Sequence, residues 1–288
     1  MNEIILKVKF FNLKYTLECG QCFRWKKLEN EEDTYVGVIF DRVIKIKQKD
    51  DNLIIRSNKM KDLAESVIKY FDLKTDYEII EKTIMKYDNN IKKAVKNTSG
   101  TRILNQSFFE ILISYIISAN NNIPRIAKSV DKIAMLYGKE IIFEDEKYYL
   151  FPSPEDLKNV TIDEYRKCGV GFRDTYIYNV VKEILNGKLV LNDFVKLDTC
   201  KAKEKLLEVK GVGPKVADCI LLFALGRKEV FPIDVWVERV MQVLYFKNLG
   251  TTLKKIDIIK YAQNNFKEYA GIVQQHLFYN IREKMIEY

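Results

Sequence analysis

The turn at residues 211–214, Gly-Val-Gly-Pro, constrains the fold of this chain more than any other feature of the sequence. An apolar helical segment ends just before it, and proline is typical of the first position of the helix that follows. Gly211 and Gly213 are both free to adopt a positive φ, so the turn can expose backbone N–H groups at the positive end of a helix. The pattern predicts a helix-hairpin-helix over about residues 203–226. Such a motif can bind a DNA phosphate through its backbone N–H groups without contacting any base.

Two ionisable residues stand at the starts of consecutive helices behind this turn. Lys215 follows the proline directly, in a helical turn where a positive charge is disfavoured and the neutral, nucleophilic amine is favoured. Asp234 ends a loop ahead of the next apolar helix, at the position expected of an N-cap. Taken singly, Lys215 is better interpreted as a solvated surface lysine and Asp234 as a cap alone. Together, behind a phosphate-binding hairpin, they indicate chemistry on DNA.

The first third of the chain has the pattern of an antiparallel sheet. Three short segments separated by turns that contain aspartate fit a β-meander at residues 35–40, 43–48 and 53–55. The second of these segments alternates strictly between apolar and polar side chains, which is typical of a strand with one buried face. From about residue 60 the apolar period becomes helical, and helices dominate to the end of the chain.

A nearly all-apolar helix at residues 107–119 must be buried, and the asparagines that follow break it before Pro124 begins another helix. We place a domain boundary near residue 95, just before the polar stretch Lys-Asn-Thr-Ser-Gly. The sequence therefore predicts an α+β fold. An N-terminal antiparallel β domain with flanking helices occupies residues 1–95, and an all-helical domain occupies residues 96–288.

The composition limits the partners and the cellular setting. Forty-eight basic and forty acidic residues give the 288-residue chain a formal charge of +8, which favours a polyanionic partner. The five cysteines are odd in number and scattered, and the N-terminus lacks the pattern of a signal peptide. We therefore expect a protein of the cytoplasm, or of the nucleus in a eukaryote.

Metal and membrane sites find little support in the sequence. Cys19 and Cys22 form a Cys-x-x-Cys pair, but no second pair or nearby histidine supplies further zinc ligands. His276 is the single histidine, and we interpret it as structural. No apolar run approaches the roughly 20 residues that span a bilayer. We expect no metal, no cofactor and no membrane segment.

Beyond the hairpin, the chain resembles the 8-oxoguanine DNA glycosylase branch of the helix-hairpin-helix, Gly/Pro-Asp superfamily of base-excision glycosylases. The similar segments occur in the family order: GQCFRW at 20–25, SANNNIPR at 118–125, GFR at 171–173, KGVGPKVADC at 210–219, FPIDVW at 231–236, and YAG at 269–271 followed by Gln274 and Phe278. The resemblance covers nearly the whole chain. It implies a monomeric DNA repair enzyme that needs no metal or cofactor and excises 8-oxoguanine from duplex DNA.

The resemblance also implies a mechanism that begins on Lys215. The neutral amine attacks C1′ of the lesion nucleotide, displaces the base and leaves a Schiff base, from which β-elimination cleaves the strand. Asp234 stabilises the positive charge that builds on the sugar. The protein is therefore expected to be both a DNA glycosylase and an AP lyase.

Four residues are implied in binding the extruded base. Gln274 and Phe278 are four apart on a predicted helix and share a face, one offering an amide to the Watson–Crick edge and the other a stacking surface. Cys219 would contact the opposite face of the base, and the carbonyl of Gly20 would accept the N7 proton that distinguishes 8-oxoguanine from guanine. From spacing alone, Phe278 and Cys219 are better interpreted as core residues, and the alternative for Gly20 is a plain turn glycine.

The remaining family positions concern the DNA around the lesion. Asn120 resembles the residue that fills the gap left by the base, although an Asx turn or a helix C-cap explains it equally well. Arg125 and Arg173 match arginines that contact the cytosine opposite the lesion. Phe172 stands where the family often has a tyrosine wedge, and Trp236 replaces a histidine that lies near a DNA phosphate. The first substitution leaves the strength of opposite-base discrimination open, and the second leaves the phosphate contact either lost or replaced by stacking.

Two alternative functions remain on sequence grounds. The first is a glycosylase for another lesion, such as an alkylated base or an oxidised pyrimidine, that uses the same lysine and aspartate. The segments around Gly20 and Phe278 argue against it. The second is a non-catalytic helix-hairpin-helix DNA-binding protein in which Lys215 only contacts a phosphate.

Overall fold

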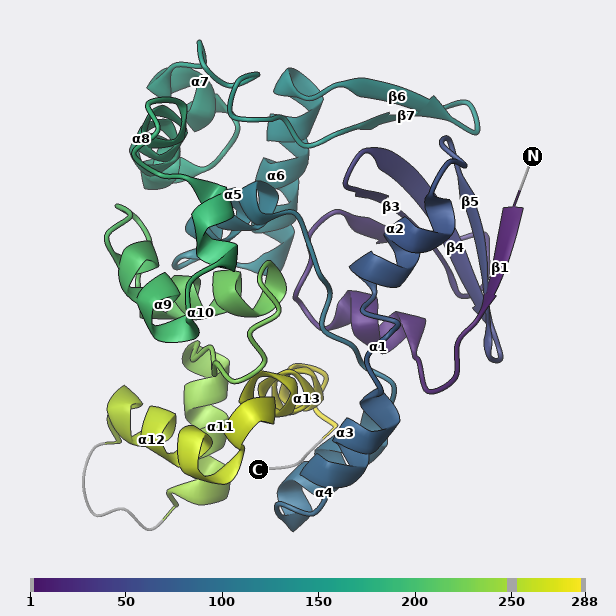
Figure 1. Cartoon of the computed structure of the whole chain (residues 1–288), viewed down its shortest axis with the longest axis vertical. Coiled ribbons are helices and arrows are strands. Elements are labelled where there is room, and N and C mark those ends of the chain that lie inside the picture. Colours follow the sequence, from purple (N-terminus) through teal and green to yellow (C-terminus); the bar gives the residue numbers. More distant parts are fainter. Residues whose placement is uncertain (1–2, 248–252, 286–288) are drawn as a thin grey trace.

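The computed structural model describes residues 3–247 and 253–285, and it has the predicted α+β fold (Figure 1). Five antiparallel strands form one sheet in the order β1-β5-β4-β3-β2. The strands are β1 (Glu3–Lys7), β2 (Trp25–Lys27), β3 (Thr34–Ile39), β4 (Arg42–Lys49) and β5 (Asn52–Ser57). The predicted meander β3-β4-β5 is confirmed. The two edge strands, β1 and β2, were missed because they are short and lack a clear alternation.

Two helices cover one face of the sheet. The helices α1 (Leu13–Glu18) and α2 (Leu63–Tyr70) bury apolar side chains against strands β4 and β5, where Ile44, Ile46 and Ile55 are fully buried. Burial of this apolar surface is the main stabilising contribution to a half-exposed antiparallel sheet. The N-terminal part therefore has its own hydrophobic core.

Among the described residues, eleven further helices follow the sheet and α2. They are α3 (Tyr77–Ile84), α4 (Asn89–Asn97), α5 (Phe108–Ser118), α6 (Ile123–Tyr137), α7 (Ile162–Lys167), α8 (Asp174–Leu185), α9 (Thr199–Leu207), α10 (Pro214–Phe223), α11 (Val235–Tyr245), α12 (Lys255–Asn265) and α13 (Ala270–Arg282). The central helix is α5, which is buried along almost its whole length and packs on α10. The predicted apolar helix before the asparagine break is thereby confirmed. No helix among the described residues is long and apolar enough to cross a membrane.

The hairpin of β6 (Glu140–Phe143) and β7 (Glu146–Tyr149) joins the helical part to the sheet, across which it reaches in Figure 1. Phe143 packs in a small cluster with valines of β3 and β4. Glu144, at the tip of the hairpin, accepts hydrogen bonds of 2.9 Å from both Lys45 and Arg56 on the sheet. This contact helps to hold the two parts together.

The predicted boundary near residue 95 stays a prediction. The buried side chains of α3 and α4 belong to the same large hydrophobic cluster as the later helices, whereas the smaller cluster around the sheet draws on residues up to Leu73 and on Leu104. The helix α2 therefore belongs to the core of the sheet, and α3 and α4 belong to the core of the helical part.

The predicted helix-hairpin-helix is formed by α9 and α10. Gly211 has a φ of +96°, and a Cβ there would lie 2.7 Å from the ring of Tyr176, so only glycine fits. Gly213, which was equally free to adopt a positive φ, does not use that freedom. Gly213 caps α10 with a φ of −92° and has no atom within 4 Å of an added Cβ. Pro214 takes the first helical position, as predicted.

Candidate active site

A cavity of about 340 Å³ lies where α5, α10, α11 and α13 meet the segment before β2. The six residues expected to act on or bind the base all line it: Gly20, Lys215, Cys219, Asp234, Gln274 and Phe278. They come from four separate stretches of the chain, which the fold brings together. The lining of the cavity also includes Tyr115, Ser118, Trp236, Gln275 and Arg282.

The amine of Lys215 is positioned by the central helix. Lys215 lies in the first turn of α10, and its Nζ donates a hydrogen bond of 3.2 Å to Oγ of Ser118. Ser118 in turn donates to the carbonyl of Tyr115 over 2.7 Å. The Nζ also lies 5.0 Å from the centre of the Tyr115 ring, within the range of a cation–π contact. Lys215 is therefore held in the cavity rather than extended into solvent.

Asp234 is the N-cap of α11, as predicted, and it also faces the cavity. Its Oδ1 accepts a hydrogen bond of 2.8 Å from the backbone N–H of Val237. Burial raises the pKa of Asp234, while the bond from Val237 and the positive charge of Lys215 oppose that shift. The carboxylate is thus oriented by its cap in the same cavity as the amine, in a place where water screens its charge poorly.

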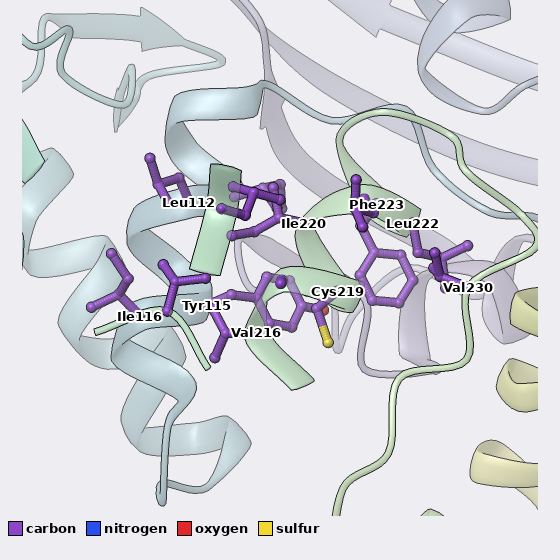
Figure 2. Packing of buried hydrophobic residues seen from close by; sticks show 14 of the residues in the cluster. Leu112, Tyr115, Ile116, Val216, Cys219, Ile220, Leu222, Phe223 and Val230 are labelled. Carbon is purple, nitrogen blue, oxygen red and sulfur yellow. The ribbon is translucent and has the colours of Figure 1, made fainter. Parts of the chain in front are cut away.

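One wall of the cavity is made of soft and aromatic groups. Burial raises the pKa of Cys219 to about 12, so the side chain is a neutral thiol. Cys219 lies near Tyr115 and Phe223, whose rings stack with centres 5.6 Å apart (Figure 2). This wall can contact the flat face of a base but cannot act as a nucleophile at neutral pH.

The opposite wall combines Phe278 and Gly20. Gly20 has a φ of +81°, and a Cβ there would lie 3.1 Å from Cε1 of Phe278. The backbone at Gly20 therefore runs directly against the ring, which a larger residue would prevent. Phe278 is only partly buried, so part of its surface remains open to the cavity.

Several lining residues were missed by sequence reasoning. Arg282 lies one turn beyond Phe278, with its guanidinium 5.8 Å from the centre of that ring, and it donates to the carbonyl of Glu18. The four-residue spacing from Phe278 was a usable signal for Arg282. Gln275 is a buried polar residue directly beside Gln274. Tyr115 carried no signal, because it lies in a helix whose sequence is nearly all apolar, and Ser118 was noted only as the start of the segment 118–125.

A second cavity, of about 600 Å³, adjoins the first. It is lined by Asn120, Gly211, Gly213 and Trp236, and it shares Lys215 and Asp234 with the first cavity. Asn120 is exposed in the left-handed conformation with a φ of +51°. The hairpin, the asparagine break and the catalytic candidates therefore form one continuous hollow.

The two predicted arginines differ in their surroundings. Arg125 is exposed at the start of α6. Arg173 is only 6% exposed, and its guanidinium donates to the carbonyls of Ala119 (2.9 Å), Asn120 (3.0 Å) and Val170 (3.0 Å). In this structure Arg173 supports the turn that carries Asn120. Beside it, Phe172 is 60% exposed.

His276 is a residue of α13 whose side chain is buried in the core, which agrees with the interpretation that it has a structural role. Its Nδ1 is 2.7 Å from Oγ1 of Thr98, and burial lowers its pKa to about 3, so the ring is neutral. No group of three or more metal-ligating side chains occurs within residues 3–247 and 253–285.

Comparison with known proteins gives matches along almost the entire chain. Residues 3–112 match the family model of the 8-oxoguanine DNA glycosylase N-terminal domain, and residues 113–260 match that of the HhH-GPD superfamily of base excision DNA repair proteins. A probable N-glycosylase/DNA lyase of Methanothermobacter thermautotrophicus is 34% identical over 242 residues, which cover 77% of this chain and 76% of that protein. An N-glycosylase/DNA lyase of Saccharomyces cerevisiae is 32% identical over 79% of this chain and 66% of its own length.

A solved structure is similar over nearly its full length. The 8-oxoguanine glycosylase/lyase of Clostridium acetobutylicum, in complex with duplex DNA that contains cytosine opposite 8-oxoguanine, has a TM-score of 0.91 and 36% identity. The alignment covers 98% of this chain and 99% of that one.

Proposed function

The chain belongs to the 8-oxoguanine DNA glycosylase family, and from that premise we propose a role for each residue of its cavity. It is an N-glycosylase and DNA lyase that acts on 8-oxoguanine. The observation that carries the residue assignments is the meeting of one amine and one carboxylate, Lys215 and Asp234, in a cavity walled by Phe278 and Cys219.

We propose that Nζ of Lys215, once it has lost a proton, attacks C1′ of the lesion nucleotide. The new C1′–N bond forms as the C1′–N9 bond breaks, and the base leaves with the electron pair of that bond. The sugar ring then opens to an imine on Lys215, and loss of a C2′ proton expels the 3′ phosphate by β-elimination. Asp234 faces the positive charge that develops on the sugar and stabilises it in the transition state.

The extruded base is held between Phe278 and Cys219 in this proposal. The close approach of the Gly20 backbone to Phe278 favours a hydrogen bond from N7–H of 8-oxoguanine to the Gly20 carbonyl. Guanine has no proton on N7, so this contact separates the two bases. Gln274, buried on the same helix as Phe278, offers its amide to the Watson–Crick edge.

Removing the ring of Phe278 should weaken binding of the lesion selectively. Phe278→Ala should lose roughly 1 to 3 kcal/mol of stacking on the extruded base. Undamaged duplex does not insert a base, so its affinity should change little. Equilibrium binding to matched duplexes with 8-oxoguanine or guanine measures the difference. An equal loss on both would show that Phe278 serves only the core.

On the opposite strand, we propose that cytosine is the preferred partner of the lesion and that Arg125 reads it. Arg125 is exposed, and its guanidinium donors match the acceptors of the Watson–Crick edge of cytosine. Arg173 supports this function indirectly, because it holds the turn that presents Asn120 to the gap left by the base. Phe172 keeps the wedge without a hydroxyl group, which favours a preference of modest size.

Arg125→Ala should therefore remove most of the preference for cytosine. Single-turnover excision opposite each of the four bases measures it. Lys128→Ala is the matched control, because Lys128 is exposed one turn later on α6 and loses the same charge. The control should keep the wild-type order of bases. Equal rates opposite all four bases in the unmodified protein would mean that Arg125 does not read the opposite strand.

Trp236 lines both cavities and is 43% exposed, with the guanidinium of Arg239 5.6 Å from its ring. We propose that its indole stacks on the nucleotide next to the lesion. This stacking would replace the phosphate contact that the family histidine makes at this position.

The proposed function is tested by borohydride trapping on a panel of duplexes. Reduction of the imine should give a covalent protein–DNA adduct with 8-oxoguanine opposite cytosine, and little with an alkylated base or an oxidised pyrimidine. Equal trapping on those lesions would contradict the substrate assignment, and binding without any adduct would leave only a DNA-binding protein.

A further inference from the structure

Two neighbouring glutamines line the base cavity, and the proposed function uses only one of them. Gln274 and Gln275 are adjacent on α13, and each is 4% exposed. The Nε2 of Gln275 donates a hydrogen bond of 2.8 Å to Oε1 of Gln274. Because an amide carries its donors on one end and its acceptor on the other, this bond sets the orientation of the Gln274 amide.

Gln275 also carries an acceptor that the protein leaves unused. Its Oε1 is completely buried, and no donor within the described residues lies in hydrogen-bond distance. Pro232, which lines the same cavity, has no backbone N–H to offer. A buried acceptor without a partner destabilises a protein, so such an atom in a ligand cavity points to a donor on the ligand.

Both amides belong to residues that line the cavity, and each keeps polar groups that the protein does not use. Gln274 contributes the free N–H donors of Nε2 and the second lone pair of Oε1, and Gln275 contributes Oε1. The groups that make no hydrogen bond within the described residues are thus a donor and an acceptor site on Gln274 and one acceptor on Gln275, beside the second N–H of Gln275 Nε2. The Watson–Crick edge of a guanine-type base reads acceptor, donor, donor, through O6, N1–H and the 2-amino group. An adenine-type edge begins with a donor and continues with an acceptor and has no 2-amino group, so it offers no donor to Gln275 Oε1.

We propose that Gln275 is a second specificity-determining residue, whose Oε1 accepts a hydrogen bond from the exocyclic 2-amino group of the extruded base. The inference rests on the proposed function, since it requires the base to present its Watson–Crick edge to Gln274. Gln275 then acts twice: it orients the Gln274 amide, and it adds a contact at C2 that one amide does not supply.

The test compares two duplexes that differ only in the 2-amino group. One carries 8-oxoguanine and the other 8-oxohypoxanthine, each opposite cytosine. In single-turnover assays the wild-type protein should excise 8-oxoguanine about tenfold faster, because the analogue leaves the buried acceptor unpaired. Gln275→Met keeps the length of the side chain and removes its amide. This variant should excise 8-oxoguanine about tenfold more slowly, with a ratio between the two bases close to one.

A matched control separates specificity from stability. Leu277 is buried on the same helix and does not line the cavity. Leu277→Ala should lower the melting temperature and keep the tenfold ratio. Equal wild-type rates on the two bases would overturn the proposal without any variant, and so would a Gln275→Met protein that retains the wild-type ratio. Failure of the proposed function gives a different result. Borohydride would then trap no adduct with the wild-type protein, or would still trap one with Lys215→Gln, whatever the ratio between the two bases.

Discussion

Lys215→Gln should abolish both base excision and the trapped adduct while leaving binding to lesion DNA nearly intact. The glutamine keeps most of the side-chain volume beside Tyr115 and Ser118, but an amide nitrogen cannot attack C1′ or form an imine. Excision should fall by roughly four orders of magnitude or more, the scale on which removal of a covalent nucleophile acts. Single-turnover excision, borohydride trapping and equilibrium binding measure the three properties separately.

The charge-matched control for this variant is Lys188→Gln. Lys188 is exposed just after α8 and lines neither cavity, so its loss removes one positive charge without touching the site. Excision by this control should stay near the wild-type rate. Undiminished base release by Lys215→Gln would contradict the assignment of Lys215 as the nucleophile. Lys215 would then serve only as a phosphate contact.

Asp234→Asn should slow excision by about 100-fold or more, because it removes a positioned negative charge opposite a developing positive one. Asparagine is as good an N-cap as aspartate, so α11 should remain intact and the melting temperature should change little. The wild-type protein needs the ionised carboxylate, whose pKa is raised by burial, so its excision rate should fall as the pH drops through that pKa. The variant should lack this acid limb.

Asp76→Asn is the matched control, because Asp76 caps α3 in the same way, accepting from Ile79 over 3.1 Å, and lies outside both cavities. It should show the wild-type rate and the wild-type pH profile. A near wild-type rate for Asp234→Asn would mean that Asp234 is a helix cap and nothing more.

Local features of the fold could be predicted because their causes lie within a few residues of sequence. The positive φ at Gly211, the proline that opens α10 and the cap at Asp234 each depend on neighbours no more than one helical turn away. The same holds for Gln274 and Phe278, whose four-residue spacing places them on one helix face. The two edge strands were missed, because β1 and β2 are short and have no clear alternation.

The sequence by itself therefore determined the division into a β-sheet part and a helical part, the helix-hairpin-helix, and the residue types of the catalytic pair. The family resemblance supplied the roles of that pair. Only the tertiary structure decided which distant groups meet. Ser118 holds Lys215 from a helix 97 residues away, and the Gly20 backbone lies against Phe278 at the other end of the chain. Arg173, expected to be free for DNA, is instead turned onto the carbonyls of Ala119 and Asn120. The physical reason is that such contacts depend on how whole elements pack, and packing depends on the shape of the entire core rather than on any local pattern of side chains.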